Sequence, residues 1–256
     1  MTNTDDQPAA VAGSSPERAD PLDGIELVVF DKDGTLIEFH RMWRDWVGEL
    51  GDRLGRATGR PMRAAMYGLM GVDERSGTID AQGLLAATPM NRLRELVVES
   101  LTDEGLDPAT AEQAVAVAWD PPDPVVLAHP TADLPTLFGR LAAQGIRAAV
   151  ATSDDRRPTE RTLEALGVAD RIEALACADD GFPGKPAPDS VLRIAAELRV
   201  PPERILVVGD APADLRMGRA AGVRRVVGVL TGVGDEATLS PLADLVLDSV
   251  ADLAPG

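Results

Sequence analysis

Acidic side chains in two short motifs are the residues of this chain best suited to chemistry. Residues 31–35, Asp-Lys-Asp-Gly-Thr, directly follow an apolar run, and Asp210 and Asp214 form a Gly-Asp-x-x-x-Asp pattern after another. Grouped carboxylates can attack an electrophile, transfer protons or hold a hard cation. Two further motifs are the hydroxyl pair at residues 152–153, which ends a third apolar run, and Lys185 in a Gly-Lys-Pro-Ala-Pro loop.

Lysine is rare in this chain. Among the 25 basic residues, Lys32 and Lys185 are the only lysines, and all the others are arginines. A position that keeps lysine indicates a need for a compact ammonium, which a planar guanidinium does not imitate. We therefore expect Lys185 to bind an anion. Alternation along an extended segment predicts that Lys32 points away from Asp31 and Asp33, which leaves a structural role and a substrate contact both open.

Short apolar runs alternate with helical patterns along much of the chain. Strands are predicted at residues 25–30, 146–151, 172–176, 205–208, 225–229 and 245–247, and helices at residues 134–144, 160–166, 190–198 and 212–221. This alternation predicts an α/β fold, a doubly wound parallel sheet with helices on both faces.

A parallel sheet would bring the motifs together. Asp31, Thr152 and Asp210 each follow a different predicted strand, so they should converge at the carboxyl edge of the sheet, where such folds bind ligands. Carboxylates gathered there would repel one another without a cation, and Mg²⁺ is the natural candidate. The nearby lysine and hydroxyl predict that the metal faces an anion, most plausibly a phosphoryl group.

About 115 residues separate the first two predicted strands, far more than one crossover helix requires, which predicts an inserted domain. Its pattern is helical throughout, and it holds all three tryptophans, the single tyrosine and five of the seven methionines. We expect these bulky side chains to form its core, and some of them to line a ligand pocket. The predicted apolar helix faces comprise Trp43, Val47, Leu50 and Leu54; Met62, Met66, Leu69 and Met70; and Leu93, Leu96, Val97 and Leu101, and Asp107-Pro108 caps a last helix.

These patterns divide the chain into three parts. Residues 1–22 are predicted to be a disordered tail, residues 23–37 and 129–256 the α/β core domain, and residues 38–128 the helical cap domain. The tail is rich in Ala, Ser, Pro and Asp and lacks an apolar stretch, so we expect neither a signal peptide nor a transit peptide.

The overall charge excludes some classes of partner. The formal net charge is −17, which argues against binding to nucleic acid or to anionic membranes. The single cysteine, Cys177, permits no internal disulfide and is expected to be inert packing, and no apolar run approaches the roughly 18 residues of a membrane span. We expect a soluble, cytoplasmic protein, and the sequence leaves open whether it is a monomer or a homodimer.

Over residues 25–253 the four motifs, in this order, resemble those of haloacid dehalogenase (HAD) superfamily hydrolases. The resemblance implies a HAD core with a helical C1 cap, as in phosphoglycolate phosphatase and β-phosphoglucomutase relatives. It also implies a site with catalytic residues Asp31 (nucleophile) and Asp33 (general acid and base), substrate-binding residues Thr152, Ser153, Lys185 and Gly34, and Mg²⁺ held by Asp31, Asp33, Asp210 and Asp214. Dehalogenases and P-type ATPases of the superfamily lack the second aspartate of the first motif, so Asp33 favours chemistry on a phosphate ester.

The resulting prediction is a Mg²⁺-dependent phosphatase that hydrolyses a small phosphorylated metabolite, a phosphoglycolate-type monoester, through an aspartyl-phosphate. A β-phosphoglucomutase-like sugar-phosphate mutase and a non-catalytic phospho-aspartate receiver or sensor are the alternatives. The two histidines, His40 and His129, flank the insertion. They either contact the substrate or sense cap closure, or are incidental polar residues.

Overall fold

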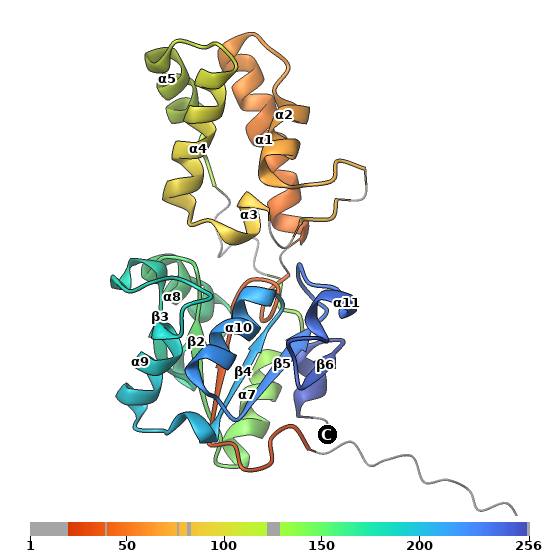
Figure 1. Cartoon of the computed structure of the whole chain (residues 1–256), viewed down its shortest axis with the longest axis vertical. Helices are drawn as coiled ribbons and strands as arrows, with labels where there is room; N and C mark the ends of the chain where they lie inside the picture. The colour runs from red at the N-terminus through yellow and green to blue at the C-terminus, as the bar shows by residue number, and fades with distance from the viewer. Residues whose placement is uncertain (1–19, 39, 76, 81–82, 122–128, 255–256) are drawn as a thin grey trace, which may run out of the picture.

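The computed structural model describes residues 20–254 except 39, 76, 81–82 and 122–128, and omits the side chains of residues 40–42 and 87. An α/β domain lies below a helical domain (Figure 1). Most of the predicted tail falls outside the described residues. Leu22, its last residue, is buried in the core of the α/β domain.

A six-stranded parallel sheet forms the centre of the α/β domain, in the order β3-β2-β1-β4-β5-β6. Its strands are β1 (Leu27–Phe30), β2 (Arg147–Ala151), β3 (Ile172–Ala176), β4 (Ile205–Gly209), β5 (Arg225–Val229) and β6 (Leu245–Leu247). Leu27 pairs with Arg147 on one side and with Ile205 on the other, so β1 is an interior strand. The parallel sheet and all six predicted strands are confirmed.

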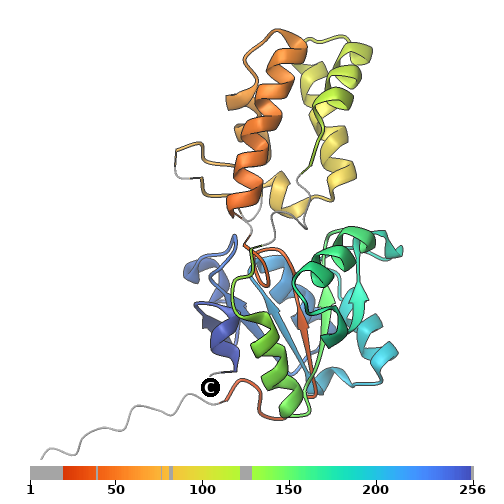
Figure 2. The ribbon, with the colours of Figure 1, turned by 180° about the vertical axis from the view of Figure 1, so that it is seen from behind.

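Helices cover both faces of the sheet, as predicted (Figures 1 and 2). Alternate residues of β1 face opposite sides, since Val28 and Phe30 belong to one apolar cluster and Leu27 and Val29 to another. The first cluster includes side chains of α7 (Leu134–Ala143) and α8 (Arg156–Ala165), and the second includes side chains of α9 (Asp189–Leu198), α10 (Pro212–Ala221) and α11 (Glu236–Leu239). Short 3-10 helices lie at η1 (Ala169–Arg171), η2 (Ala178–Asp180), η3 (Pro202–Arg204) and η4 (Val250–Leu253).

The inserted domain has an apolar core of its own. Its helices are α1 (His40–Thr58), α2 (Arg63–Met70), α3 (Leu84–Ala87), α4 (Met90–Asp103) and α5 (Pro108–Ala118). Trp46 is central to this core, with its ring edge-to-face on Trp43 at 5.5 Å and on Trp119 at 5.2 Å between centroids. The predicted cap of the last helix is confirmed, because Asp107 Oδ2 accepts the Thr110 N–H at 2.9 Å.

The prediction that the insertion is helical throughout is wrong for the segment between α2 and α3. The described residues of that segment form a loop in which Val72 and Ile79 make an antiparallel bridge. Gly71 ends α2 with a left-handed backbone (φ +73°), and Gly77 allows the turn that returns the chain (φ +75°). These glycines interrupt the helical structure, and the spacing of the apolar residues did not predict the interruption.

The two ends of the insertion lie side by side above the sheet. Ile37 forms a bridge with Pro130, and the Glu38 N–H donates to the His129 carbonyl at 2.8 Å. This pairing places the helical domain over the carboxyl edge of the strands (Figure 1). None of the helices formed by the described residues has both the length and the apolar character needed to cross a bilayer.

Candidate active site

The strand order decides where the predicted motifs meet. The chain winds from β1 toward β3 on one side and from β4 toward β6 on the other, so the direction reverses between neighbouring strands β1 and β4. Asp31 follows β1, Asp210 follows β4, and Thr152 follows β2. Crevices at such reversal points are the usual ligand sites of open α/β sheets. The predicted convergence of Asp31, Thr152 and Asp210 is therefore confirmed.

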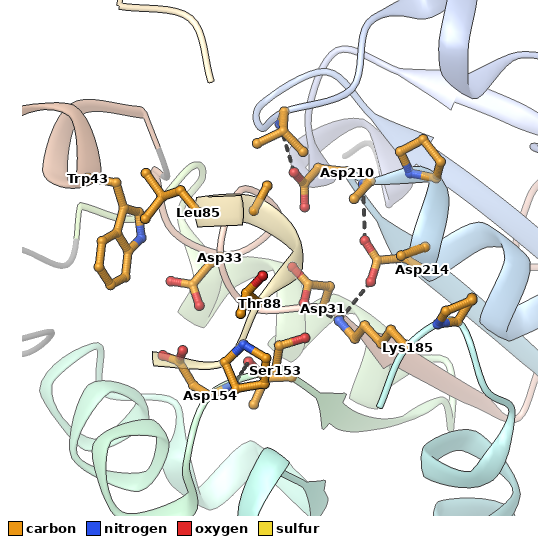
Figure 3. A pocket seen from close by; sticks show the side chains of 18 of the residues that line it. Asp31, Asp33, Trp43, Leu85, Thr88, Ser153, Asp154, Lys185, Asp210 and Asp214 are labelled. Carbon is orange, nitrogen blue, oxygen red and sulfur yellow. Dashed lines mark hydrogen bonds and ion pairs between the residues drawn. The ribbon is translucent and has the colours of Figure 1, made fainter. Parts of the chain in front are cut away.

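Three buried carboxylates form a compact group at this edge (Figure 3). One oxygen from each of Asp31, Asp210 and Asp214 lies within 4.8 Å of the other two. The Lys185 ammonium forms an ion pair with Asp31 Oδ1 and lies 2.7 Å from Asp214 Oδ1. Lys185 thus joins the acidic motifs from its own loop, and its predicted binding of an anionic substrate stays a prediction.

Asp210 is held in place from both sides. Thr35 Oγ1 donates to Asp210 Oδ1 at 3.2 Å, and the Val233 N–H donates to Asp210 Oδ2 at 2.8 Å. A Cβ atom at Gly34 or at Gly232 would collide with the Asp210 carboxyl group, so both positions require glycine.

Gly34 also adopts a left-handed backbone, with φ +87°. Its N–H donates to the Ile37 carbonyl at 2.7 Å, inside its own turn. The contacts of Gly34 therefore do not support the predicted binding of substrate at this residue. They show instead that it makes room for Asp210.

Lys32 differs from the sequence prediction, and Asp33 lies apart from the other acidic residues of the site. The Asp33 carboxylate does not belong to the group of Asp31, Asp210 and Asp214. Its Oδ2 atom is instead 2.7 Å from Lys32 Nζ, so the prediction that the Lys32 side chain points away from Asp33 is wrong, whereas the assignment of Asp33 as a metal ligand stays a prediction. The reason is a turn: the backbone leaves the strand conformation after Asp31, and alternation no longer applies.

A cavity of about 400 Å³ opens between this edge and the helical domain. The sheet side contributes Asp31, Asp33, Thr152, Ser153, Asp154, Lys185, Asp210 and Asp214, and the helical domain contributes Trp43, Leu85, Ala86, Thr88, Pro89 and Met90. Thr152 is buried and Ser153 is exposed, and both line the cavity, a position compatible with their predicted binding of substrate. The described cap residues that face it are apolar except for Thr88.

Burial changes the proton affinity of these carboxyls. It raises the pKa of Asp33 to about 7, an effect that the Lys32 ammonium opposes. Burial also raises the pKa of Asp214 to about 6, against the effect of Lys185, and raises the pKa of Asp210 with help from the charges of Asp31 and Asp214. Such shifts indicate that the buried group of carboxylates is short of positive charge.

The acidic group fits a divalent cation. Asp31, Asp210 and Asp214 offer only oxygen atoms, the ligands that Mg²⁺ prefers. Three carboxylates against the single Lys185 ammonium leave two negative charges, which one divalent cation would neutralise.

Sequence reasoning missed two contributors to the site. The first is Asp154, which forms an ion pair with Lys32. The second is the loop of residues 231–234, in which the Val233 N–H donates to Asp210 and Thr231 Oγ1 donates to the Gly34 carbonyl at 2.6 Å. The Thr-Gly-Val-Gly sequence, which begins two positions after the end of the predicted strand at 225–229, was a usable signal, because glycine-rich loops at the carboxyl edge commonly approach ligands closely.

The two histidines and the cysteine are the remaining candidates from the sequence. His129 is exposed, and its carbonyl serves the pairing of the insertion ends, while the side chain of His40 lies outside the described part. Cys177 is buried, as expected, and burial raises the pKa of its thiol to about 11.

Comparisons with known proteins agree with this geometry. The sequence profile of the haloacid dehalogenase-like hydrolases matches residues 25–222. The phosphoglycolate phosphatase of Rhodospirillum rubrum is 33% identical over 88% of each chain. The N-acetylmuramic acid 6-phosphate phosphatase of Pseudomonas aeruginosa is 31% identical over 78% of this chain and 80% of that protein.

A solved structure with the same architecture is that of a predicted phosphoglycolate phosphatase from Haemophilus somnus. It covers 90% of this chain and 96% of its own, with a TM-score of 0.64 and 18% identity. At that identity the likeness establishes the fold, which is the doubly wound α/β core with an inserted helical domain.

Proposed function

Because this chain belongs to the haloacid dehalogenase-like hydrolase family, we propose that it uses Mg²⁺ and an aspartyl-phosphate on Asp31 to hydrolyse a small phosphorylated metabolite. The chain is a phosphoric monoester hydrolase, in agreement with its family and with the phosphatases among its relatives. The observation that carries the finer proposal is the meeting of Asp31, Lys185 and the other two carboxylates beneath one cavity.

We assign the covalent step to Asp31. Its carboxylate attacks phosphorus, and the bond between phosphorus and the alcohol oxygen breaks as Asp33 gives that oxygen a proton. Lys185 and Thr152 bind the phosphoryl oxygens. Asp31, Asp210 and Asp214 would hold Mg²⁺, whose positive charge would offset the repulsion between the phosphate dianion and the attacking carboxylate.

The second step returns the site to its starting state. Asp33, now ionised, accepts a proton from a water molecule, which attacks the aspartyl-phosphate and releases inorganic phosphate. The burial that raises the pKa of Asp33 to about 7 supports both roles, because the carboxyl can give up and regain a proton near neutral pH. We further propose that the helical domain covers the cavity during these steps and excludes bulk water.

The substrate class follows from the relatives and the cavity. We propose phosphoglycolate-type and sugar-phosphate monoesters as the first candidates, since the two relatives act on phosphoglycolate and on N-acetylmuramic acid 6-phosphate by name. The cavity of about 400 Å³ has room for leaving groups of either size.

A panel of phosphate monoesters tests the proposal. With Mg²⁺ present we expect release of inorganic phosphate from at least one member, and none after removal of the metal with EDTA. Interconversion of sugar-phosphate isomers without release of phosphate would instead establish a mutase. Turnover that persists unchanged in EDTA would overturn the proposed metal dependence.

A further inference from the structure

We propose that Lys32 is a positioning residue, which orients Asp33 for proton donation by linking it to Asp154. This role rests on the proposed phosphatase function, and it explains how the carboxyl of the general acid is oriented toward the substrate. It also accounts for one of the two lysines in the chain.

The Lys32 side chain is 1% exposed, and its ammonium lies between two carboxylates. Nζ is 2.7 Å from Asp33 Oδ2 and 2.9 Å from Asp154 Oδ2. Burying an ammonium is costly unless opposite charges surround it, so the two aspartates and the lysine stabilise one another's positions. A guanidinium is larger and planar, so it would not reproduce the compact contact that Lys32 Nζ makes with both carboxylates.

The bridge leaves the two oxygens of Asp33 in different situations. Oδ2 is held by Lys32, whereas Oδ1 is buried and has no hydrogen-bond partner among the described residues. Asp33 lines the cavity, and in the view of Figure 3 it lies between Asp31 and Trp43. Oδ1 is therefore the oxygen available to share a proton with the leaving group of a substrate held at Asp31.

Asp154 anchors the other end of the bridge to the phosphate-binding loop. Its N–H donates to Thr152 Oγ1 at 3.2 Å, and its carbonyl accepts the Ala178 N–H at 2.9 Å. Lys32 thus connects the loop after β1, which carries nucleophile and acid, to the loop after β2, which binds phosphate. Since misplacement of a catalytic group by about 1 Å costs on the order of 100-fold in rate, this connection bears directly on proton transfer.

Two phosphate esters of similar size distinguish an effect on the position of Asp33 from a general loss of protein stability. Para-nitrophenyl phosphate releases a stable phenolate that needs little protonation, whereas benzyl phosphate releases an alkoxide that needs a proton. The ratio kcat/KM reports the steps up to departure of the alcohol, where Asp33 acts as the acid.

We expect Lys32→Met to lower kcat/KM for benzyl phosphate by about 100-fold, which is the lower end of general acid–base contributions. The same variant should lower kcat/KM for para-nitrophenyl phosphate by no more than about threefold. Asp33→Asn sets the limiting case and should show the same selectivity to a larger degree. Asp154→Asn changes a partly exposed carboxylate and should show the same selectivity between the esters to a smaller degree. This variant replaces Lys32→Met as the test if Lys32→Met does not fold.

Arg156→Met is the matched control, because Arg156 forms a structural ion pair in the same region, 2.8 Å from Asp180 Oδ2. It should change the two esters by the same factor. If the Lys32 and Asp154 variants lose kcat/KM equally for both esters, Lys32 has a structural role only. If they lose none, Lys32 has no role in the reaction, and either result overturns the proposal. If the wild-type protein with Mg²⁺ hydrolyses neither ester nor any other phosphate monoester, the proposed function fails and this inference fails with it.

Discussion

Asp31 and Asp33 carry the same side chain two positions apart, and their neighbours differ completely. Asp31 lies close to Lys185 and to the carboxylates of Asp210 and Asp214. Asp33 instead forms an ion pair with Lys32. Chemically identical carboxyls acquire different tasks when their environments differ in this way. Asp31 lies beside the ammonium and carboxylates that would bind a phosphoryl group and its metal, whereas the surroundings of Asp33 suit a group that exchanges a proton.

Replacing Asp31 by asparagine tests the nucleophile. The amide keeps the shape of the side chain but not its nucleophilic charge, so we expect less than about 1% of wild-type kcat with any monoester that the protein hydrolyses. Circular dichroism and the melting temperature provide the folding control. A folded variant that retains more activity would exclude Asp31 as the nucleophile.

The cysteine provides a prediction about pH. Because burial raises the pKa of Cys177 to about 11, its thiol is protonated at about pH 8, and only the thiolate reacts with alkylating agents. We expect slow modification of the native protein by iodoacetamide, a rate that increases as the pH rises toward 11, and fast modification in denaturant. Fast modification of the folded protein at about pH 8 would contradict the burial of this residue.

At the scale of elements, the loop of residues 231–234 connects the helical domain to the acidic group. The Val233 side chain packs against the apolar core of the cap, while its N–H holds Asp210. One short segment therefore contacts both halves of the cavity. This suggests that the position of the cap and the position of Asp210 are mechanically linked.

Gly232→Ala tests this loop. The added Cβ would collide with the Asp210 carboxyl, and displacing the support of a metal ligand commonly costs about 10- to 100-fold in metal affinity or activity. We expect a loss of that size in kcat/KM, together with a higher Mg²⁺ concentration for half-maximal activity.

Gly139→Ala in α7 is the control for this substitution. Among the described residues, no atom outside the neighbouring backbone of α7 lies within 4 Å of the Cβ position there, so the change should leave activity and metal dependence unaltered. A normal metal requirement in Gly232→Ala would show that the loop tolerates the extra methyl group.

At the scale of the whole molecule, the net charge of −17 includes a few buried carboxylates with a direct effect on stability. The pKa values of Asp33 and Asp214, about 7 and 6 in the fold, exceed the ordinary value of 3.8. The folded protein therefore keeps protons that the unfolded chain has already released. Without metal, the free energy of unfolding should decrease as the pH rises from about 4 to about 7.

Mg²⁺ should oppose this loss of stability. A cation that binds the folded state stabilises it, and it binds best once the carboxyls are ionised. We expect Mg²⁺ to raise the melting temperature relative to EDTA more at about pH 8 than at about pH 5. Asp214→Asn should remove most of this difference, and an equal increase at both pH values would place the bound metal elsewhere.

Local patterns were sufficient for much of this architecture. Apolar runs and helical spacing identified the six strands and the α/β class, since burial imposes those periods on the residues themselves. The motifs also grouped Asp31, Thr152 and Asp210, because parallel strands of one sheet must end at the same edge. Asp214 belongs to the same motif as Asp210, and the scarcity of lysine singled out Lys185.

The contacts of Lys32, Asp33 and Gly34 depended on the tertiary structure. A turn after Asp31 reverses the direction in which alternation would point Lys32, and Asp154, its partner, comes from a loop far away in the sequence. Gly34 leaves space for Asp210 of another motif, a requirement that is invisible within its own turn. Periodicity and motif order are properties of neighbouring residues, whereas the choice of partner for a buried charge is made only when distant loops pack together.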